Sequence, residues 1–113
     1  MDSILVSIKK LLGIAADYTH FDPDIIMHIN SAFSILTQLG VGPPEGFRIE
    51  DNTKTWTDFI GDATKIDAVK SYIYLKVGLM FDPPISSAVL SAKERQISEL
   101  EWRLNVAAEQ ESN

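Results

Sequence analysis

The chain has 113 residues, no cysteine, 45% hydrophobic and 23% charged residues, and a formal net charge of −6. This length fits one domain with a modest core. The lack of cysteine excludes disulfides and thiolate chemistry, and the negative charge argues against a free-standing protein that binds DNA through its phosphates. No apolar run approaches the roughly 18 residues of a membrane-spanning helix. Because the first residues also lack the basic start of a secretory signal, we expect a cytoplasmic origin.

The first 40 residues predict two helices. Ser3 is a suitable cap for a first helix, which Gly13 ends. Asp22 and Pro23 predict the start of a second helix, with the Asp22 side chain as the cap acceptor and proline where no amide donor is needed. Apolar residues then recur every three or four positions until Gly40, which stops the helix.

The next segment cannot be helical, because glycines and prolines fill residues 41–46. Apolar and charged residues alternate over 47–50, which predicts a short strand or an extended arm. We expect a protruding loop or short β-hairpin near residues 41–53. Phe47 and Ile49 then either contact a neighbouring subunit or pack locally on their own domain.

Two further helices are predicted before residue 82. Thr53 or Thr55 caps a short helix that Gly61 closes, and Asp62 caps a longer helix that ends at Phe81.

The apolar surface of the helix predicted over 62–81 covers roughly half of its circumference, whereas a one-sided surface helix needs a stripe of about 100°. Such a helix is either central in a bundle or packs on another subunit. The main apolar stripe consists of Ile66, Val69, Ile73, Val77 and Met80. Its flank consists of Tyr72, Leu75 and Leu79. We expect some of the three flank residues to be shared between subunits or shielded by the last helix.

Two consecutive prolines end that helix, and Ser86 or Ser87 caps a last helix that runs to about Val106. The polar residues beyond it have little to bury. We therefore expect one helical domain over residues 1–107 and a flexible C-terminal tail over residues 108–113.

Trp102 lies off the aliphatic stripe of the last helix, beside Arg95, Glu99 and Val106. It is either an interface anchor, a role in which tryptophan is common, or it packs along the stems of its neighbours. The residues expected at an interface are therefore Phe47, Ile49, Tyr72, Leu75, Leu79, Trp102 and Val106.

No cluster in the sequence predicts catalysis. The nearest approach to a metal site is a group of two histidines and two carboxylates, His20, Asp22, Asp24 and His28. Their spacing matches no established ligand motif, and isolated carboxylates do not define an acid–base site. We expect no enzyme activity, no metal and no cofactor.

Eight short segments, in this order and at this spacing, resemble the small head–tail connector, or adaptor, proteins of long-tailed bacteriophages and prophages. They are FDPDI (21–25), INSAF (29–33), LGVG (39–42), FRI (47–49), WTDF (56–59), KSYIYLK (70–76), FDPP (81–84) and ELEWRL (99–104). The resemblance extends over about residues 1–106. It implies a helical subunit that self-associates into a ring beneath the portal protein and supports the next neck protein. DNA would pass through the channel without specific binding.

Taken together, the sequence predicts a mainly α fold, a small bundle of about four to five helices. The expected function is a structural one in the virion neck, with assembly in the host cytoplasm and no membrane contact. The alternatives are a small helical regulatory module that binds one protein partner, and a small enzyme with an unrecognised carboxylate site.

Overall fold

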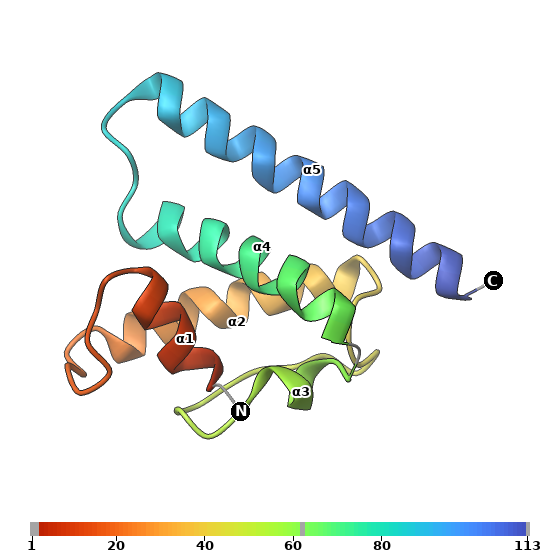
Figure 1. Cartoon of the computed structure of the whole chain (residues 1–113), viewed down its shortest axis with the longest axis horizontal. Coiled ribbons are helices and arrows are strands. Elements are labelled where there is room, and N and C mark those ends of the chain that lie inside the picture. Colours follow the sequence, from red (N-terminus) through yellow and green to blue (C-terminus); the bar gives the residue numbers. More distant parts are fainter. Residues whose placement is uncertain (1–2, 62, 113) are drawn as a thin grey trace.

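The computed structural model describes residues 3–61 and 63–112. Within them, five helices form the regular structure (Figure 1): α1 (Ile4–Leu11), α2 (Asp22–Gln38), α3 (Trp56–Phe59), α4 (Ala63–Phe81) and α5 (Ser87–Ser112). The prediction of a mainly helical bundle is confirmed. Of the two alternatives for residues 41–53, a loop or a short β-hairpin, the structure shows a loop. Among the described residues, the one strand-like pairing is the isolated antiparallel bridge between Ser3 and Thr55. No helix of the described residues is long and apolar enough to cross a membrane.

Helix α4 is central and contacts each of the other four helices. α5 lies along one side of it, and α1, α2 and α3 lie on the other side (Figure 1). Val69, Tyr72, Ile73 and Val77 of α4 have no exposed surface. Of the two alternatives for the wide apolar helix, the central position in a bundle is therefore confirmed.

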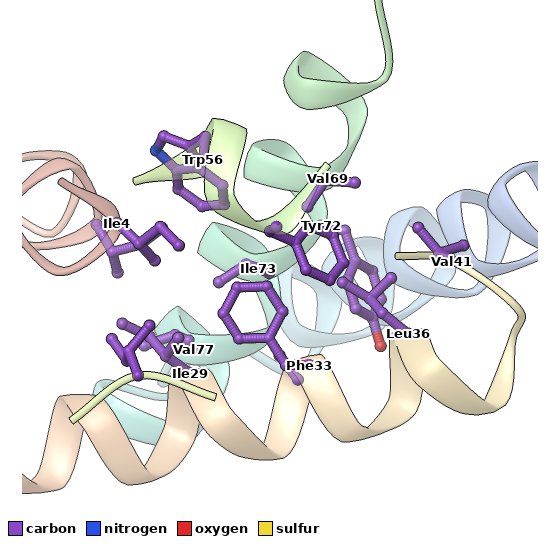
Figure 2. Packing of buried hydrophobic residues seen from close by; sticks show 14 of the residues in the cluster. Ile4, Ile29, Phe33, Leu36, Val41, Trp56, Val69, Tyr72, Ile73 and Val77 are labelled. Atoms are coloured by element: carbon purple, nitrogen blue, oxygen red, sulfur yellow. The ribbon is translucent and has the colours of Figure 1, made fainter. Parts of the chain in front are cut away.

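The core between α4 and α2 is built around Phe33 (Figure 2). The Phe33 ring lies 4.7 Å from that of Phe59 and 5.0 Å from that of Phe47, measured between centroids. Trp56 closes the side next to α1, where its indole N–H donates to the Ser7 hydroxyl at 2.8 Å. An indole nitrogen inside a core needs such a partner, so this bond fixes α3 against α1.

The connection between α1 and α2 is held by a buried lysine. The Lys9 ammonium donates to the carbonyl oxygens of Ala16 (3.1 Å) and Tyr18 (2.7 Å), and it lies 2.8 Å from a carboxylate oxygen of Asp22. The prediction that Asp22 caps α2 is wrong, because α2 begins at Asp22 itself, and Phe21, in the cap position, makes no side-chain bond. The carboxylate instead neutralises an ammonium that would be costly to bury alone.

The segment between α2 and α3 packs on its own domain. Asn30 of α2 donates to the Ile49 carbonyl at 2.9 Å and accepts from the Ile49 amide at 2.8 Å. Gly42 has φ +83°, and a Cβ there would lie 2.4 Å from the Phe59 ring. The expected extended arm is thus fixed to α2 and α3, and its longest run of exposed residues is the tip over residues 50–54.

Helix α5 continues to Ser112, past the predicted end near Val106. Neither glycine nor proline follows Val106, and alanine, glutamate and glutamine favour a helix. The Asn105 side chain also donates to the Leu39 carbonyl at 3.1 Å, which ties this part of α5 to the end of α2. The predicted cap Asp62 and the last residue of the predicted tail lie outside the described residues.

The Asn30 contact generates a stability prediction. Asn30→Ala leaves the amide and carbonyl of buried Ile49 without partners, and we expect a loss of about 1–3 kcal/mol in the free energy of unfolding. Thermal and urea unfolding measure this loss. Ser34→Ala, an exposed substitution on the same helix, is the matched control and should unfold like the parent chain; equal stability of the two variants would contradict the role of Asn30.

Candidate interaction surfaces

Two of the four polar residues considered for metal binding, Asp22 and His20, make contacts within the subunit. Asp22 is paired with Lys9, and the His20 ring packs edge-on against Phe21 with centroids 4.9 Å apart. Among the described residues, no group of three or more histidine or carboxylate side chains is placed to hold a metal ion. The arrangement stabilises the loop before α2.

Two of the residues predicted for an interface lie inside the subunit, and a third, Phe47, is partly covered. Tyr72 is 0% exposed and Ile49 is 1% exposed. Phe47 is half-buried, and its ring lies beside those of Phe33 and Phe59. A partner could reach Tyr72 and Ile49 only if the subunit opened, so we assign these two residues to the core.

The remaining predicted residues reach the surface to different degrees. Leu75 and Leu79 are half-buried, and Leu75 lines a shallow cleft of about 340 Å³ between α4 and α5. Val106 is half-buried, whereas Trp102 is 66% exposed. Among the residues predicted for an interface, Trp102 therefore offers the largest exposed side chain for a contact.

A polar bond fastens α5 to the middle of α4. The Tyr72 hydroxyl donates to a carboxylate oxygen of Glu101 at 2.8 Å. Burial of the ring, together with this bond and the negative charge of Glu101, raises the pKa of Tyr72 above its ordinary value of 10.0. For Tyr72, the subunit shows the second of the two alternatives given for the flank residues, shielding by the last helix.

The side of α5 that faces away from α4 is largely exposed, and Glu99 on this side is paired with Arg103 of the same helix at 2.6 Å. Of the α5 side chains that the structure describes, over 87–110, only Ile97 and Leu104 are buried, and none of those over 87–96 is buried. Positions three or four apart form an outward row on this helix. We call this row the outer stripe, and it consists of Ala88, Ala92, Arg95, Glu99, Trp102 and Val106.

A groove runs along the side of α2 that faces away from α4. It is open, with a volume of about 860 Å³, and lies between the helix and the segment 45–48. Met27, which is 57% exposed, lines it on the helix side, and Phe47 lines the opposite wall. We call it the α2 groove; its other helix residues are Pro23, Ile26, Asn30, Ser31, Ser34, Thr37 and Gln38.

Sequence reasoning did not find the α2 groove. The one available signal was the row of small polar side chains on the outer side of α2, including Ser31 and Ser34. The opposite wall comes from a segment whose path was predicted as a protruding arm, so the concave shape could not be anticipated.

A family model described as phage connector protein matches residues 4–111, nearly the whole chain. Searches of curated proteins and of solved structures gave no match.

The Tyr72 contact predicts a specific pH dependence. In the folded state the raised pKa keeps the phenol protonated, whereas the unfolded chain releases this proton above about pH 10. The free energy of unfolding should therefore fall as the pH rises above 10. Tyr72→Phe should lower stability by about 1 kcal/mol at neutral pH and weaken the alkaline decline.

Urea unfolding at a series of pH values measures both effects. Tyr18→Phe removes the hydroxyl of a tyrosine that is 50% exposed, and it serves as the control. A decline that is equally steep in Tyr72→Phe and in the parent chain would rule out Tyr72 as its source.

Proposed function

Because the chain belongs to the phage connector protein family, whose model matches residues 4–111, we propose that it is a structural subunit of the neck of a tailed bacteriophage. In this proposal, copies of the subunit form a ring beneath the portal protein. The ring extends the DNA channel, completes the head after packaging and supports the next neck protein. The family match is the observation that carries the proposal.

The surfaces of the subunit support a role in assembly. The outer stripe and the α2 groove leave both flanks of the bundle available for protein contacts. Phe47, Leu75, Leu79, Trp102 and Val106 remain the proposed contact residues from the sequence, while Ile49 and Tyr72 lie in the core.

The charge of the chain supports passage of DNA. The formal net charge is −6, and like charges repel. A ring of such subunits would hold DNA weakly through phosphate contacts, as a channel requires.

Deletion of the gene from the phage or prophage that encodes the chain tests this function. We expect heads that package DNA but retain it poorly, and free tails that do not join the heads. Electron microscopy counts the joined particles, and nuclease treatment measures the DNA that escapes. Expression of the intact chain from a plasmid should restore joining.

Normal joining and normal DNA retention after deletion would disprove a neck function. Mass spectrometry of purified particles provides an independent control, because a neck subunit must be present in them. A chain found only with a soluble bacterial protein would indicate a regulatory module instead.

A further inference from the structure

We propose that neighbouring copies contact each other head to tail, with the outer stripe of one copy seated in the α2 groove of the next. Trp102 is the side chain that enters the groove. This inference rests on the proposed function, since it names the surfaces by which the subunits would form their ring.

The placement of the two surfaces favours a head-to-tail contact. Both α2 and α5 pack on α4, from different sides, and the stripe and the groove each face away from it. A contact between two different surfaces of identical subunits is heterologous, and it repeats around a ring when the rotation closes. A symmetric dimer would instead pair one surface with itself and leave the other unused.

The shapes of the two surfaces match. Small side chains at Ser31 and Ser34 line the groove on α2, which allows a second helix to approach closely. Trp102, 66% exposed, offers a large ring to it, and Met27, 57% exposed, offers a flexible thioether. Sulfur–aromatic contacts are favourable, and tryptophan is enriched among residues that dominate binding.

The charges also suit a contact between copies. The outer stripe carries Arg95 and Glu99, of which Glu99 is also paired with Arg103 at 2.6 Å, and the groove wall carries Glu45 and Arg48. Each surface thus has one charge of either sign, so opposite charges can meet across the contact. This arrangement offsets the repulsion between copies with net negative charge and favours one register over others.

The contact is expected to be weak in solution. The small side chains that permit close approach also bury little apolar area, and association must offset lost rotational and translational freedom. Free subunits should therefore be monomeric or weakly associated, while particles hold many copies side by side.

Paired cysteines test the contact directly, because the chain has no cysteine of its own. Four variants combine Arg95→Cys or Glu99→Cys on the stripe with Ser31→Cys or Ser34→Cys in the groove. Purified particles are treated with a short bis-maleimide and run on a denaturing gel. We expect at least one pair to give a ladder of dimers, trimers and larger species.

Single-cysteine variants distinguish the geometry, since a head-to-tail contact needs one cysteine from each surface. They should stay monomeric on the gel, as should Glu99→Cys combined with Thr53→Cys in the exposed tip. The proposal is overturned if no pair gives a ladder in particles of normal content, or if single-cysteine variants give dimers as efficiently as the pairs. Absence of the parent chain from particles would instead refute the neck function.

Trp102→Ala provides a second readout. Because the indole is exposed, we expect a melting temperature within a few degrees of the parent chain but at least about a tenfold loss of incorporation into particles. Tyr18→Ala removes another exposed aromatic ring, outside both surfaces, and should incorporate normally. Equal incorporation of the two variants would contradict the role of Trp102, and so would unfolding of the Trp102 variant.

Discussion

The need to cover α4 determines the positions of the other helices. Its buried residues, Val69, Tyr72, Ile73 and Val77, occupy more of the circumference than one neighbouring helix can cover. α2 and the two shorter helices therefore pack on one side, and α5 on the other. Because α2 and α5 each use one side to cover α4, each keeps an outward side. The constraint that builds the core thus also produces the two free helix surfaces.

Features set by neighbouring residues could be predicted from the sequence. The start of α1 after Ser3, the stop of α2 near Gly40 and the start of α5 after Ser86 follow from local backbone chemistry. The central place of α4 followed from the width of its apolar surface. α5 extends beyond its predicted end because low apolar content does not end a helix, and the residues after Val106 favour one.

Features set by distant residues could not be predicted. Asp22 appeared to be a helix cap, but its partner is Lys9, thirteen positions earlier. The alternation over 47–50 predicted a strand, yet the groups that pair with Ile49 belong to the side chain of Asn30. Such side-chain contacts leave no periodic pattern. For the same reason, an exposed side chain could be expected at Trp102, but the sequence alone could not exclude an exposed side chain at Tyr72.

The buried ammonium also limits how the chain can change during evolution. Lys9 holds the carbonyl groups of Ala16 and Tyr18 together with Asp22, so one side chain fixes both the length and the path of this connection. An inserted or deleted residue there would separate the charge from its partners. The exposed tip over 50–54 contains no buried side chain, and its backbone is held at one end, where the Lys54 carbonyl accepts from the Ile4 amide at 2.9 Å. Insertions and deletions among related chains should therefore accumulate in that tip, while the connection before α2 keeps a constant length.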